Sequence, residues 1–295
     1  NMYYIPFALY QRFTNLDMHE LYCAGHHFEG AIAYYQATGK KKYLDLAAYF
    51  INTRGTENDR NRVAYNQSHL PVREQTEAVG HSVRAVYLYT GMAYLAAETG
   101  DESLIAACKT LWEDTTHRKM YVTGGLGSTY IGEAFTTPFD LPPDQAYTET
   151  CAGIALCFFA KAMLALENKA EYADVIERAL YNGVLSGLST DGAQFFYENP
   201  LEIDPKFNDV HHSVNQHERF PITERLEVFN CSCCPPNVVR FIPSVSGMMY
   251  GENEDTVFVH QYAASEARFG ATSIIQTTDY PADGAITLRC ATDKK

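Results

Sequence analysis

The chain has 295 residues, of which 46% are hydrophobic and 13% aromatic, so it can bury one large core or two smaller ones and is not mainly disordered. Its formal net charge of −13 makes nucleic acid an unexpected partner, because the phosphate backbone is also negative. The sequence contains no run of about 18 apolar residues, so we expect no membrane-spanning segment.

Three stretches in the first 180 residues share one pattern: an apolar helical segment, a short polar turn and a second amphipathic helix. They are residues 31–48, 92–107 and 162–179. The turns of the first two contain Gly39 and Gly100, which suit a helix C-cap because that position needs a positive φ. Stacked helical hairpins predict an open solenoid or a closed α/α toroid, and a generic helical bundle is the alternative.

The longest loop expected between these hairpins is residues 124–145, which has three glycines in its first four positions and three prolines near its end. Loops of this length within a compact domain usually carry function. Glu133 lies in this loop and could act as a general acid/base if burial raised its pKa. A solvated surface charge is the alternative for any single glutamate.

The pattern of the chain changes after residue 192. Residues 193–201 read as a strand, and the polar segment 202–230 reads as a loop. Residues 234–250 read as a helix that is entered through proline and that Pro243 should kink or interrupt. The segments that follow alternate as β-strands do, with a turn at Asp283-Gly284, and predict the start of a β-sandwich: residues 256–264, 271–280 and 285–291.

The eight cysteines are unevenly distributed, because Cys231, Cys233 and Cys234 crowd into four positions. Adjacent cysteines rarely bridge each other, and a chain of this length is an unusual disulfide scaffold. The cluster therefore predicts reduced thiols that bind a metal or act in catalysis. Reduced thiols also favour a cytoplasmic protein.

Glu149 and Cys151, together with Cys233 and Cys234, supply one carboxylate and three thiolates, which can fill a tetrahedral zinc shell. Residues two apart on a regular helix point about 200° apart, so Glu149 and Cys151 could share an ion only at an irregular helix start. Cys234 precedes a proline, which favours an extended turn there. The spacing matches no standard zinc finger, and buried cysteines without a metal are the alternative.

Seven motifs follow one another over nearly the whole chain: ELYCAGH (20–26), HLPVREQTEAVGHSVRAVYLYTGMA (69–93), YVTGGLGSTYIGEAF (121–135), AYTETCAGIAL (146–156), YADVIERALYNGVL (172–185), FFYENPL (195–201) and CSCCPPNVVR (231–240). Together they resemble the β-L-arabinofuranosidase family, glycoside hydrolase family 127. The resemblance implies a mainly α fold, an (α/α)6 barrel followed by β-sandwich strands. It places a catalytic barrel domain at residues 1–250 and the start of a truncated β-sandwich domain at 251–295.

The resemblance also implies a role for individual residues. Zinc would be held by Glu149, Cys151, Cys233 and Cys234. Cys233 would be the nucleophile, and Glu133 the general acid/base. The residues implied to line the sugar pocket are His26, His81, Glu177 and Tyr197.

The implied activity is that of a retaining glycosidase which cleaves terminal β-L-arabinofuranosyl residues from a small saccharide or glycan. One alternative is a hydrolase of the same fold that acts on another glycan, and a second is an inactive sugar-binding protein with a structural zinc. A thiol redox protein finds no support, because no thioredoxin-like βαβ pattern is present. Enzymes of this architecture often pair, so a homodimer is possible, but the sequence does not determine the oligomeric state.

Two departures from the family pattern qualify these expectations. Members have a further helical hairpin between the CAGH and HLPVREQ motifs, and here one hairpin is missing. Tyr130 stands where a variant of the GEAF loop has histidine, which could alter the choice of substrate.

Overall fold

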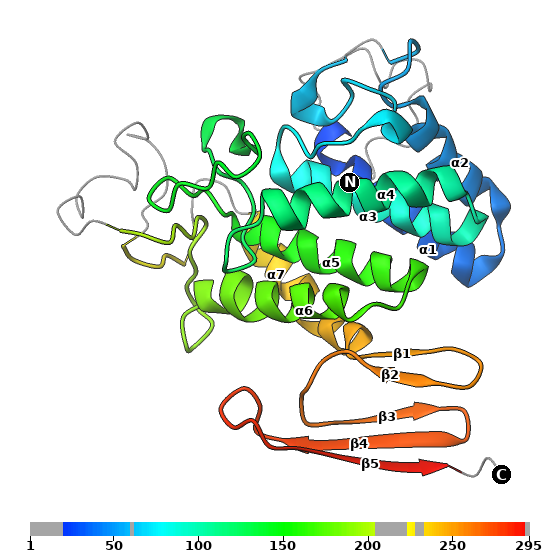
Figure 1. The fold of residues 1–295 in the computed structure, drawn as a ribbon, viewed down its shortest axis with the longest axis vertical. Coiled ribbons are helices and arrows are strands. Elements are labelled where there is room, and N and C mark those ends of the chain that lie inside the picture. Colours follow the sequence, from blue (N-terminus) through cyan, green and yellow to red (C-terminus); the bar gives the residue numbers. More distant parts are fainter. Residues whose placement is uncertain (1–19, 60–61, 204–222, 228–232, 293–295) are drawn as a thin grey trace. The chain divides into compact units, whose positions relative to one another are not determined.

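The computed structural model describes residues 20–59, 62–203, 223–227 and 233–292, with backbone only at 20–23 (Figure 1). The chain divides into two compact units, Asn1–Val238 and Val239–Lys295. The domain boundary expected near residue 250 stays a prediction. Within the described residues, no helix is long and apolar enough to cross a membrane.

Three helical hairpins build the first unit, as the sequence pattern predicts. Helix α3 packs against α1 on one side and against α5 on the other, and each of these three helices also packs against its own hairpin partner. The pairs are α1 (Glu20–Thr38) with α2 (Lys41–Thr53), α3 (Ser82–Thr99) with α4 (Glu102–Arg118), and α5 (Thr150–Leu166) with α6 (Ala170–Ala179).

The position of each helix follows from its hydrophobic pattern. Helices α3 and α5 are buried on almost every side, which suits inner helices, whereas α2 and α6 bury one face only. The ring of Trp112 on α4 lies 5.4 Å from Phe159 on α5 and 4.8 Å from Tyr172 on α6, between ring centroids. These three rings join an inner helix to two outer ones.

The turns of the first two hairpins have the predicted C-cap geometry. Gly39 and Gly100 both adopt a φ of 66°. The N–H of Gly100 donates to the carbonyl of Ala96, so the last turn of α3 closes on this glycine.

The extended segment 193–201 differs from the strand predicted for it. The described residues there form only isolated bridges, Leu188 with Phe195, Phe195 with Leu226 and Glu149 with Glu198. Its bridge partners are turns and a helix start, so no second strand lies alongside to form a ladder within the described part of the chain. Most of the predicted loop 202–230 falls outside the described residues.

The helix predicted at 234–250 is shorter than expected. Helix α7 spans Cys234–Ser244 and continues as a 3₁₀ turn, Val245–Met248. Pro243 lies one residue before the end of α7, so the proline marks the change from α-helix to 3₁₀ turn.

The second unit contains two small antiparallel sheets. Strands β1 (Tyr250–Glu252) and β2 (Val257–Val259) form a hairpin, and β3 (Ser265–Phe269), β4 (Thr272–Thr278) and β5 (Ile286–Thr292) form a three-stranded sheet in that order. Strands β2, β4 and β5 confirm the three predicted β-type segments, whereas the short β1 and β3 were not predicted.

Candidate active site

The four predicted metal ligands, separated by up to 85 positions in sequence, come together in the structure. The Sγ atom of Cys151 lies 3.8 Å from Sγ of Cys233 and 3.5 Å from Sγ of Cys234. The two adjacent cysteines have their sulfurs 3.8 Å apart, and Oε1 of Glu149 lies 3.5 Å from one and 3.9 Å from the other. A disulfide needs about 2.05 Å between sulfurs, so these contacts are not disulfides.

The spacing of these atoms fits one tetrahedral ion. Bonds of about 2.3 Å to sulfur and 2.0 Å to oxygen place the sulfurs about 3.8 Å apart and each sulfur about 3.5 Å from the oxygen. The sulfur–sulfur distances are 3.5 to 3.8 Å. Oε2 of Glu149 is buried without a hydrogen-bond partner among the described residues. The donor set and its dimensions therefore suit a metal ion.

Irregular helix starts make this convergence possible. Glu149 is the N-cap of α5 and has non-helical backbone angles, φ −59° and ψ 137°, whereas Cys151 lies in the first turn. The irregular helix start expected for a shared ion is therefore present, and ion binding by both residues stays a prediction. Cys234, expected in an extended turn, is instead the first residue of α7, because Pro235 and Pro236 fit the first turn of a helix.

Burial favours the protonated, neutral forms of the acidic groups in this cluster. Desolvation raises the pKa of Glu149 and of Cys234 well above their usual ranges. The pKa of Cys151 is raised chiefly by its contact with Cys233. Four acidic groups this close together repel one another when ionised, and a divalent cation would reverse that preference because it stabilises the deprotonated forms.

Tyr197 reaches the cluster from the extended segment. The carbonyl of Tyr197 accepts from the N–H of Thr150, and the next residue, Glu198, forms a bridge with Glu149. This pairing holds the segment against the start of α5. The phenol Oη of Tyr197 lies 3.3 Å from Sγ of Cys233, and burial raises the pKa of Tyr197.

Glu133 and His81 form a second polar group beside the cluster. Nε2 of His81 lies 2.8 Å from Oε2 of Glu133, and the exposed fractions of these side chains are 2% and 23%. His81 is the N-cap of α3. Each of the three groups His81, Glu133 and Glu149 offers a ligand atom within 4.8 Å of the other two, so Glu149 links this pair to the cysteines.

A tight backbone turn holds Glu133 in place. Gly132 and Glu133 have φ values of 69° and 54°, both in the left-handed region. The hydroxyl of Ser82 donates to the carbonyl of Glu133, and Ala134 pairs with both His81 and Thr129. The Gly-rich loop is thus fastened to the start of α3.

Comparison with known proteins identifies the family of this chain. Residues 35–247 match the family described as β-L-arabinofuranosidase, GH127 catalytic domain. The chain belongs to this family. It is 40% identical over 274 residues to a non-reducing end β-L-arabinofuranosidase of Bifidobacterium longum subsp. longum, a match that covers 85% of this chain and 41% of that protein.

Solved structures of GH127 proteins share the fold. A GH127 β-L-arabinofuranosidase from Geobacillus stearothermophilus T6 matches with a TM-score of 0.84 and 40% identity, over 97% of this chain and 54% of that one. A GH127 β-arabinofuranosidase matches with a TM-score of 0.79 and 42% identity, over 90% of this chain and 39% of that one. The α/α barrel fold and the family are therefore established, while the chain spans about half or less of the length of these relatives.

The structure places the other two residues implied by the GH127 resemblance on α1 and α6. His26 is half-buried on α1, and its ring centroid lies 4.0 Å from that of Tyr87. Glu177 is half-buried on α6, and the pKa of Tyr181 is raised first by burial and then by the charge of Glu177. Their roles in binding sugar stay predictions.

One link was not predicted from the GH127 motifs. Tyr87 donates its hydroxyl to Oδ1 of Asn237 at 3.1 Å, and the N–H of Asn237 donates to the carbonyl of Cys233. Tyr87 therefore connects His26 to the turn that carries Cys233. Both residues lie inside quoted motifs, AVYLY and CCPPN, but the sequence does not indicate that they meet.

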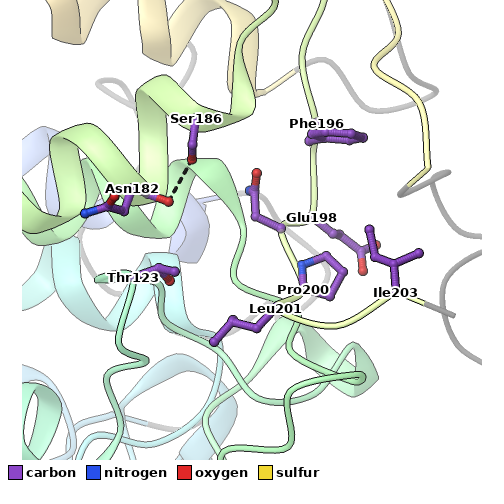
Figure 2. Close-up of a pocket in the computed structure, with 9 residues that line it drawn as sticks. Thr123, Asn182, Ser186, Phe196, Glu198, Pro200, Leu201 and Ile203 are labelled. Atoms are coloured by element: carbon purple, nitrogen blue, oxygen red, sulfur yellow. Dashed lines mark hydrogen bonds between the residues drawn. The ribbon is translucent and has the colours of Figure 1, made fainter. Parts of the chain in front are cut away.

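The extended segment also lines a cavity of 390 Å³ (Figure 2). Phe196 and Glu198 line it, whereas Tyr197, between them, reaches Cys233.

Proposed function

We propose that this protein is a retaining glycoside hydrolase that removes terminal β-L-arabinofuranosyl residues and uses a zinc-bound cysteine as its nucleophile. The observation that carries the proposal is the joining of two groups through Glu149: three cysteine sulfurs on one side and the Glu133–His81 pair on the other. A double-displacement glycosidase needs a nucleophile and a proton donor in one site, and Glu149 lies within 4.8 Å of both groups.

The proposed ion is zinc, since three thiolates and one carboxylate in a tetrahedral arrangement are a zinc donor set. Glu149, Cys151, Cys233 and Cys234 would hold it. When bound, zinc would keep the sulfur of Cys233 deprotonated at neutral pH. The starts of α5 and α7 favour the same state, because helix N-termini carry partial positive charge and stabilise thiolates.

Cys233 is placed for nucleophilic attack because it is the half-buried member of an otherwise buried set. Its sulfur would form a bond to the anomeric carbon as the bond from that carbon to the leaving-group oxygen breaks. Glu133 would donate its proton to that oxygen. The products of this first step are a thioglycosyl enzyme and the released alcohol.

The second step would regenerate the enzyme. Glu133, now ionised, would take a proton from water while the water oxygen attacks the anomeric carbon. The carbon–sulfur bond breaks, the sulfur of Cys233 returns as thiolate, and arabinose leaves with retained configuration. His81, at 2.8 Å, would hold the Glu133 carboxyl group in one orientation through both steps.

The remaining predicted contacts would orient the sugar. Tyr197 lies next to Cys233 and would donate its hydroxyl toward a sugar oxygen, because its raised pKa keeps the phenol protonated. His26 and Glu177 are proposed to bind sugar hydroxyls. The substrate class comes from the activity named for the relatives.

A second candidate, a sugar-binding protein with a structural metal, rests on one observation. Four protein ligands would close a tetrahedral shell, and closed shells are typical of structural zinc sites. The half-buried position of Cys233 and the pairing of Glu133 favour the enzyme.

The test combines metal analysis with hydrolysis of an aryl β-L-arabinofuranoside by the protein and by a Cys233→Ser variant. The enzyme predicts about one zinc per chain, turnover by the parent, and loss of at least about a thousandfold in rate for the variant with an unchanged circular dichroism spectrum. Sugar binding by the parent with no turnover would establish the second candidate instead. A variant that keeps full activity would remove Cys233 from the mechanism.

A further inference from the structure

Tyr65 is an exposed aromatic residue beside the proposed acid/base, and neither the motifs nor the mechanism gives it a role. It is 43% exposed, in a 3₁₀ turn (Ala64–Asn66) between α2 and α3. Its ring centroid lies 5.9 Å from that of His81. A Cβ added to Gly132, the residue before Glu133, would lie 3.2 Å from Cε2 of the Tyr65 ring.

The ring is held in one place, although it is exposed. The guanidinium carbon of Arg84 lies over it, 4.8 Å from the ring centroid. The backbone carbonyl of Tyr65 accepts from the N–H of His81 at 3.0 Å and from Nε2 of Gln67 at 3.1 Å. A preorganised ring loses little entropy when a ligand stacks on it.

The exposed fraction rises from the metal ligand Glu149 through Glu133 to this ring. Glu149 is 1% exposed, the Glu133 side chain 23% and Tyr65 43%. The sugar that is cleaved reacts at the buried end, where the sulfur of Cys233 lies. The leaving group is attached on the far side of the oxygen that Glu133 protonates, so it extends toward solvent, where the Tyr65 ring lies.

We propose that Tyr65 forms the leaving-group subsite, where its ring stacks on the sugar or aromatic ring released in the first step. This inference rests on the hydrolase function proposed above. It adds that the enzyme recognises the leaving group of its substrate through this ring. Aromatic rings bind the apolar face of a sugar or another ring, and pocket specificity commonly depends on such contacts. Ile131, in the same turn as Glu133 and 69% exposed, adds apolar surface near this position.

The test compares two substrates that differ only in the leaving group, p-nitrophenyl and methyl β-L-arabinofuranoside, in the zinc-loaded protein. Tyr65→Ala should lower kcat/KM about five- to tenfold for the aryl substrate, mainly through KM, and leave the methyl substrate unchanged. Tyr65→Phe keeps the ring and should restore the parent value. Tyr49→Ala is the matched control, because Tyr49 on α2 is equally exposed at 42%.

Each result decides the proposal. Equal losses on both substrates would mean that the ring only supports His81 and Glu133, and no loss on either would mean that it touches no leaving group; both overturn the subsite. The same comparison by calorimetry on Cys233→Ala should show the aryl compound binding more tightly than the methyl one, a difference that Tyr65→Ala abolishes. A parent that neither binds nor cleaves either compound overturns the proposed function and the subsite together.

Discussion

Glu133 has a left-handed backbone conformation, which residues with a Cβ atom rarely adopt. A left-handed φ costs about 1 kcal/mol for such a residue, and here the φ is 54°. The cost is offset by the bond from Ser82 and by the pairing of Ala134 with His81. This strain fixes the direction of the carboxyl group, which is the property that a proton donor needs.

A Glu133→Gln variant tests this residue as a proton donor. The amide keeps the shape of the side chain but cannot donate an acidic proton. We expect a fall of about 10²–10⁴-fold in kcat/KM for a methyl glycoside and a much smaller fall for a dinitrophenyl glycoside, whose leaving group needs no protonation. Glu102→Gln, an exposed change on α4, is the control and should leave both rates unchanged. Equal falls on both substrates would remove the acid role.

At the scale of elements, the start of α4 is fastened by one carboxylate. Asp101 is the N-cap, and its Oδ1 accepts from the N–H of Leu104 at 3.0 Å. Arg73 pairs with the same carboxylate and also donates to Asn52 at 2.7 Å. Asp101 therefore joins α4 to the end of α2 and to the turn before α3.

These contacts make the stability of the fold depend on pH. The hydrogen bond from Ser103 and the pairing with Arg73 lower the pKa of Asp101 to about 2. A lowered folded-state pKa stabilises the protein above the unfolded value, near pH 4, and this contribution disappears as the pH falls toward 2. Because the group is partly exposed, we expect about 1 kcal/mol rather than the full shift.

Urea unfolding of the parent and an Asp101→Asn variant measures this contribution. Asparagine caps a helix as well as aspartate does, so the variant removes only the charge. The parent should be about 1 kcal/mol more stable at pH 6, and the two should converge toward pH 2.5. Asp101→Ala should be about 1 kcal/mol less stable than Asp101→Asn at every pH, because the helix cap is lost as well. A constant difference between parent and Asp101→Asn would contradict the assigned pKa.

The sequence predicted correctly those elements whose signals lie within a short stretch of the chain. The three hairpins follow from a 3.6-residue period and from glycines that cap helices, both readable within about 20 residues. The prediction of a strand at 193–201 was wrong. Alternating hydrophobic residues indicate an extended, half-buried segment, but they do not show that a partner strand lies beside it.

The site was predictable only in part. The chemistry of Glu149, Cys151, Cys233 and Cys234 indicated a metal, but their convergence depends on contacts across more than 80 positions. Family resemblance supplied those contacts. The meeting of Tyr87 with Asn237, 150 positions apart, had no local signal at all.

At the scale of the whole molecule, the cysteine cluster joins the start of α5 to the start of α7. The sulfurs of Cys151 and Cys233 are 82 positions apart in sequence. A bound ion would join the two ends of this loop. Because the ion would bind only the folded state, its binding would add to the stability of that state. A bound metal would thus hold the start of α5 against the start of α7, in addition to activating the proposed nucleophile.

Thermal unfolding with and without a chelator measures this effect. A metal at about a thousand times its dissociation constant adds about 4 kcal/mol, and 1 kcal/mol shifts the Tm of a unit this size by about 2 to 4 °C. We therefore expect Tm to fall by about 10 °C when zinc is removed and to recover when zinc is added back. The Cys151→Ser variant lacks one metal ligand, so its Tm should equal that of the zinc-free parent. Adding the chelator should not change this Tm. Cys290→Ser changes an exposed thiol on β5 and should respond like the parent. A Cys151→Ser protein that still binds one zinc and still loses stability on chelation would place the ion elsewhere in the chain.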